Sequence, residues 1–182
     1  MARLHRVKRA RKEWKCGKCG ETVEIGQPYL WWKPRYGGKR ARCYRHPPRP
    51  SEMVSSDKLS RLLAASEELE DAASLVRDGA EYGGDSADFN DVISTARDSL
   101  ETIAESIQEV GEEYRESADS IRYAFSESET ADRCEEVADE CDSWYTEVQD
   151  IDFDLDFDED WKQTLETLAD CIEGVASNTP SY

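Results

Sequence analysis

Apolar residues recur every three or four positions through most of the chain beyond residue 56. The most regular run alternates steps of four and three: Phe89, Ile93, Ala96, Leu100, Ile103, Ile107, Val110 and Tyr114. This spacing places the apolar side chains on one face of a helix that packs lengthwise against another helix. Similar runs cover residues 59–76, 134–148 and 161–175. The pattern predicts an all-α helical bundle or antiparallel coiled coil over residues 57–176; an extended coiled-coil dimer is the alternative.

Local signals set the ends of these helices. Ser55 or Ser56 is placed to cap the first helix, and Gly79 is expected to end it. A short loop at residues 83–85, Gly-Gly-Asp, follows, and its length favours a hairpin within one chain. Residues 177–182 are interpreted as a tail.

The pattern before residue 50 is different, with short apolar stretches separated by glycine and proline. Glu21–Ile25 and Tyr29–Lys33 have the composition of strands, and the Gly-Gln-Pro turn between them predicts a β-hairpin. We expect this hairpin within a small module over residues 13–46. A flexible basic arm, residues 1–12, precedes the module, and a stiff proline-rich linker, residues 47–56, follows it.

Charge divides the chain at the same place. Residues 1–50 contain 15 Lys and Arg against three Asp and Glu, although the whole chain of 182 residues has a net charge of −18. Residues 51–182 hold the remaining eight basic and 38 acidic residues. Such an asymmetry indicates two modules with different partners.

Four residues of the basic module have the spacing of a metal site. Cys16 and Cys19 are separated by two residues, and so are Cys43 and His46. Zinc takes four such ligands in a tetrahedron, and a full set leaves no open position, so we predict a structural zinc ion. A redox role for the first pair would call for a βαβ context, which the sequence lacks. A module this small also has too little apolar area to fold without such a staple.

The rest of the sequence offers no comparable chemistry. Cys134 and Cys141 lie on a helical seam and Cys171 lies beside one, so we interpret all three as small core residues. We find no glycine-rich phosphate loop and no supported nucleophile–histidine pair, and we expect no enzymatic activity. No apolar run approaches the roughly 18–20 residues of a membrane span, and no export signal is recognised. We expect a cytoplasmic protein without membrane contact, in the host cytoplasm or the virion if it is viral.

Residues 16–46 resemble a treble-clef zinc finger, and in particular the poly(ADP-ribose) polymerase-type finger. The resemblance is carried by the first ligand pair with its Gly-Lys spacer, by Val23 and Gly26, and by the Tyr-Leu-Trp-Trp stretch over residues 29–32. The pattern is also similar to small uncharacterised tailed-phage proteins that join such a finger to an acidic helical tail. The resemblance implies a zinc-stapled, treble-clef-like hairpin module that binds nucleic acid, and it brings no catalytic residue.

Cations and aromatic rings are interleaved in the basic module, which is typical of a nucleic-acid-binding surface. Each neutralised phosphate releases counterions, and exposed rings stack on bases. We predict binding of DNA more than RNA, with Tyr29 and Trp31 facing inward and the acidic helices serving oligomerisation or autoinhibition. The predicted contacts are Lys12, Trp14, Lys15, Lys18, Trp32, Lys33, Arg35, Tyr36, Lys39, Arg40, Arg42 and Arg45.

The same charge asymmetry supports an alternative function. The basic module can dock on the acidic helices of its own chain or of a neighbour, because the two charges are complementary. From Asp150 to Asp158 the sequence alternates Asp with the apolar residues Ile, Phe, Leu and Phe. A strand with this pattern has one acidic and one apolar side and would suit a basic aromatic surface. The protein would then be a non-enzymatic interaction or structural protein, such as a phage protein. Its acidic bundle would bind a basic partner or mimic nucleic acid.

Overall fold

The computed structural model describes residues 1–82, 86–155 and 161–180. The chain forms two compact units, which we call the N-terminal unit (residues 1–63) and the helical unit (residues 64–182). Each is described by itself. Within the described residues, no helix is both long enough and apolar enough to cross a membrane.

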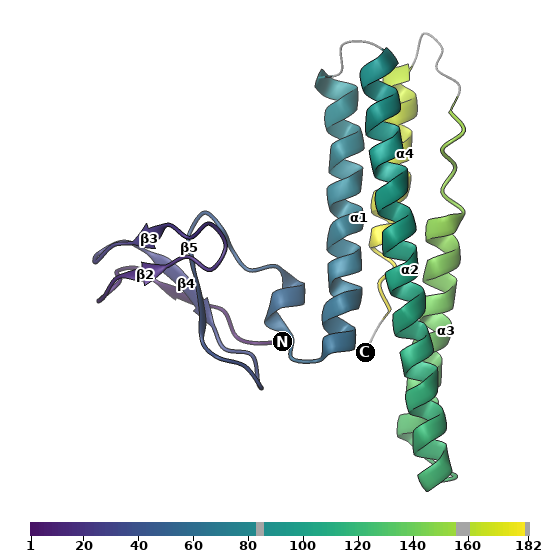
Figure 1. Ribbon diagram of the computed structural model, residues 1–182, viewed down its shortest axis with the longest axis horizontal. Helices are drawn as coiled ribbons and strands as arrows, with labels where there is room; N and C mark the ends of the chain where they lie inside the picture. The colour runs from purple at the N-terminus through teal and green to yellow at the C-terminus, as the bar shows by residue number, and fades with distance from the viewer. Residues whose placement is uncertain (83–85, 156–160, 181–182) are drawn as a thin grey trace. The chain divides into compact units, whose positions relative to one another are not determined.

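The N-terminal unit is built on two small antiparallel sheets (Figure 1). The first has three strands, with β4 (Tyr29–Trp32) between β1 (His5–Val7) and β5 (Arg40–Cys43). The second pairs β2 (Trp14–Lys15) with β3 (Thr22–Val23). A small antiparallel strand region is therefore present, but its strand pairing differs from the expected one.

The expected hairpin between residues 21–25 and 29–33 is wrong. The turn between these segments bonds to Ala10 instead of closing a hairpin: Gly26 N–H donates to the Ala10 carbonyl at 2.9 Å, and Ala10 N–H donates to the Gln27 carbonyl at 2.8 Å. Gly26 has φ +92°, a conformation open to glycine, which allows this turn. The prediction that residues 1–12 form a flexible arm is also wrong. Residues 5–7 form β1, and Ala10 is buried in the unit.

Alternation along β4 gives the central strand two different faces. Tyr29 packs on one face into a small core with Ala10 and Val23, and Trp31 is partly buried against the same core. On the other face Leu30 and Trp32 are 3% and 1% exposed. Both faces of this short strand are therefore buried, which the charged composition of the module does not reveal.

The second face is closed by the segment that was expected to be a linker. Residues Pro50–Met53 form a short 3-10 helix, η1, in which Ser51 is buried. The Trp32 indole N–H donates to the Glu52 carbonyl at 3.0 Å, and the Glu52 carboxylate pairs with Arg42. The linker prediction is thus corrected: η1 belongs to the N-terminal unit, because Trp32 needs apolar cover and a hydrogen-bond acceptor.

The described residues of the helical part form four helices: α1 (Asp57–Tyr82), α2 (Ser86–Ala124), α3 (Glu129–Gln149) and α4 (Trp161–Ala176) (Figure 1). The Leu59 N–H donates to Ser56 Oγ at 3.4 Å, so the predicted serine cap is present. Helix α1 continues past Gly79 to Tyr82, which corrects its predicted end. The predicted glycine loop at residues 83–85 lies outside the described residues.

Helix α3 packs closely along the C-terminal part of α2 (Figure 1). Small residues allow this approach: a Cβ atom at Gly111 would lie 3.1 Å from the Cys141 Cβ. The predicted seam of α2 is buried from Phe89 to Val110. The α3 seam is buried at Val137, Cys141, Trp144 and Val148, and the α4 seam at Leu165, Leu168 and Ile172. Helical periodicity therefore predicted the core of this unit correctly.

Hydrogen bonds attach α4 to its neighbours. Ser66 Oγ of α1 donates to the Ala176 carbonyl at 2.9 Å, and the Trp144 indole of α3 donates to the Val175 carbonyl at 2.8 Å. These bonds use backbone carbonyls that the last turn of a helix leaves without an intrahelical partner. The expected tail at 177–182 differs in its described part, since Asn178 donates to Glu147 at 2.7 Å and Pro180 is buried.

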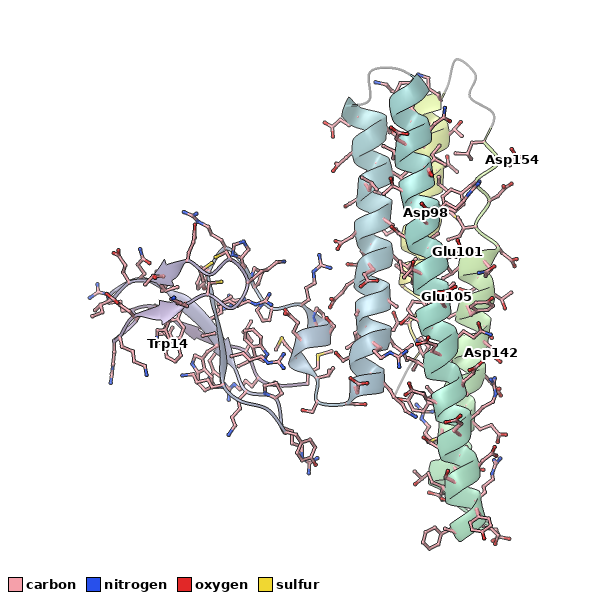
Figure 2. All side chains as sticks on the ribbon, in the orientation of Figure 1. Trp14, Asp98, Glu101, Glu105, Asp142 and Asp154 are labelled. Carbon is pink, nitrogen blue, oxygen red and sulfur yellow. The ribbon has the colours of Figure 1, made fainter. Side chains whose placement is uncertain are left out.

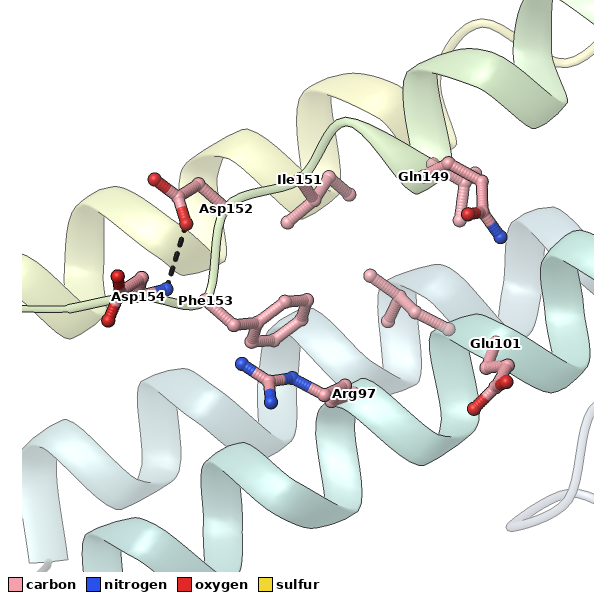
Figure 3. Close-up of a pocket in the computed structure, with 9 residues that line it drawn as sticks. Arg97, Glu101, Gln149, Ile151, Asp152, Phe153 and Asp154 are labelled. Carbon is pink, nitrogen blue, oxygen red and sulfur yellow. Dashed lines mark hydrogen bonds between the residues drawn. The ribbon is translucent and has the colours of Figure 1, made fainter.

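The Asp-rich stretch after α3 lies against α2. Ile151 is 7% exposed, and Arg97 of α2 lies 5.3 Å above the Phe153 ring (Figure 3). The Asp154 N–H bonds to Asp152 Oδ1 at 2.8 Å, which bends the chain locally. The described residues 150–155 form no strand, so the strand expected there is wrong over that range, and residues 156–158 lie outside the described part. Its apolar residues cover the bundle.

Candidate metal centre and basic aromatic surface

The first pair of predicted ligands sits on a tight turn. The Gly20 N–H donates to the Cys16 carbonyl at 3.0 Å, and Cys16 N–H donates to the Glu21 carbonyl at 2.9 Å. Gly20 has φ +71°, where a side chain would be strained. This turn brings the Cys16 and Cys19 thiols to the same side of the backbone.

The second pair comes from the end of β5. Cys43 is the last residue of the strand, and His46 N–H donates to its carbonyl at 3.1 Å, which closes a turn. The Gly17 N–H donates to the Ala41 carbonyl at 3.1 Å and attaches the first turn to β5. Backbone hydrogen bonds therefore bring two pairs of residues together that lie far apart in the sequence.

The four side chains converge on one point. The ligand atoms of Cys16, Cys19, Cys43 and His46, which we call the Cys–His cluster, all lie within 4.8 Å of one another. His46 Nδ1 lies 3.1 Å from the Cys43 sulfur and 4.0 Å from the Cys16 sulfur. Ligands bonded to a tetrahedral metal at about 2.0–2.3 Å lie roughly 3.3–3.8 Å apart, so the cluster is compatible with a metal site.

The electrostatics of the cluster favour an anionic sulfur. Burial raises the pKa of the Cys16 thiol. Hydrogen bonds from the backbone N–H groups of Cys19, Cys43 and Lys18 together lower it by more than burial raises it, so the pKa is about 6. For the exposed Cys19, a hydrogen bond from the Glu21 backbone lowers the pKa, but some loss of solvation and the neighbouring Cys16 and Cys43 sulfurs raise it overall. Several thiols thus compete for negative charge in one place, which a bound cation would relieve.

The other cysteines do not join a metal-ligand group within the described residues. Cys141 is fully buried in the helical unit, and burial raises its pKa to about 12. Cys134 is half-buried and Cys171 is exposed. Their positions agree with the interpretation of Cys134 and Cys141 as small apolar residues, whereas Cys171 lies on the surface.

Most of the predicted nucleic-acid contacts reach the surface of the N-terminal unit. The exposed ones are Lys12, Lys15, Lys18, Lys33, Arg35, Tyr36, Lys39, Arg40 and Arg45. Two predictions are wrong. Trp32 is buried beneath η1, and the Arg42 guanidinium is paired with Glu52. Both residues lie on the face of the sheet that the 50–53 segment covers.

Aromatic rings and cations form a layered group on the other face. Lys39 Nζ lies 4.8 Å from the Trp14 ring and 4.2 Å from the Trp31 ring, and Lys12 Nζ lies 4.8 Å from Trp14. His5 stacks on Trp31 at 4.0 Å, with the rings almost parallel. We call these five residues the basic aromatic cluster. Trp14 is labelled in Figure 2.

Sequence reasoning does not identify two members of this cluster as surface residues. His5 lies in the segment interpreted as a flexible arm. Trp31, interpreted as facing inward, does pack partly against the core, but it also contacts Lys39. The register pairs His5 with Trp31 across β1 and β4, so the two rings share one face. Only recognition of a strand at residues 5–7 would have found this pair.

A cleft of about 490 Å³ lies beside the cluster. It has Trp14 and Trp32 among its apolar walls and Lys15, Lys39 and Arg40 among its cations. Its remaining lining comes from Gly17, Ala41, Arg42 and Glu52. We call this hollow the basic cleft.

Comparisons with known proteins do not extend these observations. No protein-family description, no curated protein and no solved structure matches the chain. The resemblance to the poly(ADP-ribose) polymerase-type finger and to phage proteins therefore stays a prediction.

Proposed function

We propose that the N-terminal unit is a zinc-stapled module that binds nucleic acid, DNA more than RNA. The observation that carries this proposal is the placement of Lys39 over two aromatic rings, Trp14 and Trp31, in a unit rich in Lys and Arg. The Cys–His cluster supplies the rigidity that holds this surface. The acidic helices serve oligomerisation or autoinhibition in this proposal.

Zinc is the metal that suits three sulfurs and one imidazole nitrogen. Such a donor set is soft to borderline, and four protein ligands complete a tetrahedron without leaving a site for catalysis. The N-terminal unit has only a thin core around Tyr29 and a second one around Trp32. Binding of a metal would therefore add directly to the folding free energy of the unit.

Metal stoichiometry tests the zinc proposal. Native mass spectrometry of the full chain should find one zinc ion per molecule. Cys16→Ser should lose it, together with the near-ultraviolet circular dichroism of the N-terminal tryptophans. Cys171→Ser is the matched control, because it removes an exposed thiol from the helical unit. Full zinc occupancy in Cys16→Ser would contradict the proposed ligand set.

Nucleic acid suits the basic aromatic cluster for two physical reasons. The exposed cations around Lys39 can neutralise phosphates, and the Trp14 and Trp31 rings are partly accessible to a base. Stacking on an aromatic side chain contributes roughly 1–3 kcal/mol per base. Cations already stacked on these rings are placed where a phosphate next to a stacked base would lie.

Fluorescence anisotropy with the zinc-loaded full chain tests this function. A labelled single strand and a nicked duplex are titrated at about 0.05 M and about 0.2 M salt, where counterion release should weaken binding at the higher concentration. The variant Lys12→Ala/Lys39→Ala should lose affinity. Lys162→Ala is the control, because it removes a lysine from the helical unit and leaves the cluster intact. Equal affinities of the two variants would contradict a role for the cluster.

A second function is favoured by the arrangement of carboxylates on α2. Acidic residues recur every three or four positions on the face opposite the apolar seam, so they form a stripe along the helix. The members are Asp98, Glu101, Glu105, Glu109, Glu112, Glu116 and Asp119, all exposed. Figure 2 shows Asp98, Glu101 and Glu105 following one another along α2. A row of anionic groups of this kind resembles a phosphate backbone.

In this second candidate function, the stripe binds a basic protein partner in place of nucleic acid. An oligolysine peptide is the probe, and Glu101→Gln/Glu105→Gln/Glu112→Gln should weaken its binding to the full chain. Failure of the full chain to bind nucleic acid, together with binding of the peptide, would favour this candidate. The reverse result would favour the zinc-stapled nucleic-acid module.

A further inference from the structure

The loop end of the α2–α3 hairpin carries two exposed aromatic side chains. Tyr123 is 96% exposed and Phe125 is 68% exposed. Both lie where α2 ends, and Figure 1 shows this end of the two helices extending beyond α4. We call residues 119–132 the hairpin tip. Single exposed apolar residues are common, but here two aromatic side chains lie two positions apart at the end of a protruding hairpin.

The hairpin tip is held in shape. Arg122 at the end of α2 bonds to Asp132 at 2.9 Å and to Glu135, both on α3. The Phe125 N–H continues the helical pattern by donating to the Ile121 carbonyl at 2.8 Å. The aromatic side chains therefore project from a braced backbone, which lowers the entropy lost when they bind.

Charge defines the partner that fits this tip. Residues 105–140 contain 13 Asp and Glu against three Arg. All three arginines pair with carboxylates of α3: Arg115 with Asp142, Arg122 with Glu135, and Arg133 with Glu136. A partner must therefore be basic and must offer an apolar recess for the aromatic rings. A second, acidic tip is excluded as a partner by like-charge repulsion.

The basic cleft of the N-terminal unit has these properties. Its volume of about 490 Å³ admits an aromatic side chain, and the half-buried Trp14 offers an aromatic wall. Lys15, Lys39 and Arg40 line it and are exposed to meet carboxylates. One chain thus contains both the acidic hairpin tip, with its exposed aromatic side chains, and the basic cleft.

We propose that the hairpin tip of one molecule docks in the basic cleft of a second molecule. The tip and the cleft are different surfaces, so the contact is heterologous and joins molecules into a ring or an open chain. This inference goes beyond the proposed nucleic-acid function, because it requires no nucleic acid. The two would compete for Lys39, which contributes to the cluster and to the cleft.

Sedimentation velocity of the zinc-loaded full chain, without nucleic acid, tests the proposal. At about 0.05 M salt the average mass should rise with concentration above the 20.7 kDa of one chain, and at about 0.5 M it should return to that value. Two variants each remove one half of the contact: Tyr123→Ser/Phe125→Ser alters the tip, and Lys39→Glu/Arg40→Glu alters the cleft.

Each variant alone should sediment as a monomer, but an equal mixture should form a one-to-one dimer. In the mixture, the cleft variant supplies an intact tip and the tip variant supplies an intact cleft. Assembly stops at two molecules because the remaining tip and the remaining cleft of the dimer are both altered. Ile25→Ser is the control for loss of an exposed apolar side chain and should assemble like the unaltered chain. Circular dichroism and zinc content confirm that every variant is folded.

Other results would overturn the proposal. Assembly of the cleft variant alone would show a contact between tips, and a mixture that stays monomeric would show that tip and cleft do not meet. A concentration-independent monomer of the unaltered chain at low salt would place any such contact within one chain. Nucleic-acid binding by the tip variant is measured separately, so failure of this proposal leaves the nucleic-acid function to its own test.

Discussion

The Trp32 indole N–H donates a hydrogen bond to the backbone carbonyl of Glu52 at 3.0 Å. This bond joins the central strand of the N-terminal sheet to the 3-10 helix at residues 50–53. Glu52 also pairs with Arg42 through its carboxylate and accepts from the Arg49 backbone N–H at 2.9 Å. A short acidic segment thereby closes one face of an otherwise basic unit.

Substitution of Trp32 should therefore destabilise the N-terminal unit. Trp32→Phe removes the donor but keeps an aromatic ring, and we expect a loss of about 1 kcal/mol in the free energy of unfolding. Trp32→Ala empties the site and should cost roughly 3–5 kcal/mol. Urea unfolding followed by near-ultraviolet circular dichroism measures both. Tyr36→Ala, at an 81% exposed ring, should change stability little, and an equal loss there would contradict this assignment.

Two glycines should respond in opposite ways to alanine. At Gly111 a Cβ atom would lie 3.1 Å from the Cys141 Cβ and 3.6 Å from the Ala138 carbonyl oxygen, so Gly111→Ala should push α2 and α3 apart. We expect a net loss of about 1–2 kcal/mol, after a helix-propensity gain of up to about 1 kcal/mol. A Cβ atom added at Gly174 would meet no atom of a neighbouring element within 4 Å, so Gly174→Ala should stabilise α4. Thermal unfolding of the two variants compares them directly.

Cys141 should resist alkylation in the folded chain. Burial raises its pKa from 9.0 to about 12, so the reactive thiolate is scarce at pH about 9. Iodoacetamide should label the exposed Cys171 first, and both residues should react in urea. Because the folded pKa lies above the unfolded one, the contribution of Cys141 to stability should fall as the pH rises from about 9 to about 12. Mass spectrometry of the labelled peptides decides the order.

The charge of Lys39 should appear in the salt dependence of DNA binding. Lys39→Gln should reduce the slope of log affinity against log salt by about 0.7–0.9, the value for one phosphate contact. Lys39→Arg keeps the charge and should keep the slope, although the stacking over Trp14 and Trp31 changes in detail. Arg133→Gln, on the helical unit, is the control. A slope unchanged by Lys39→Gln would show that this cation contacts no phosphate.

Much of the helical unit could be predicted from the sequence, because helical burial depends on local spacing. The run from Phe89 to Val110 faces the core as its period required. The meeting of the two ligand pairs was also predictable, since their matched spacing already limits what they can form. What spacing did not reveal was how closely α2 approaches α3, which depends on Gly111 and the small residues opposite it.

The strand pairing of the N-terminal unit could not be read from the sequence. β1 and β4 are separated by more than twenty residues, and nothing local in residues 5–7 distinguishes a strand from a basic arm. Pairing brought His5 onto Trp31 and thereby created part of the basic aromatic cluster. The burial of Trp32 likewise depended on a proline-rich segment folding back over the sheet, a contact that no local propensity encodes.

By itself, the sequence determined the four residues of the Cys–His cluster, the helical seams and the division of charge between the two parts. These properties depend on residue types at fixed separations, so short-range geometry decides them. Only the tertiary structure decided which aromatic rings are buried, which cations contact them, and that Tyr123 and Phe125 stand exposed at the end of a hairpin. Those outcomes depend on contacts between segments distant in sequence, where packing and hydrogen-bond satisfaction select one arrangement among many.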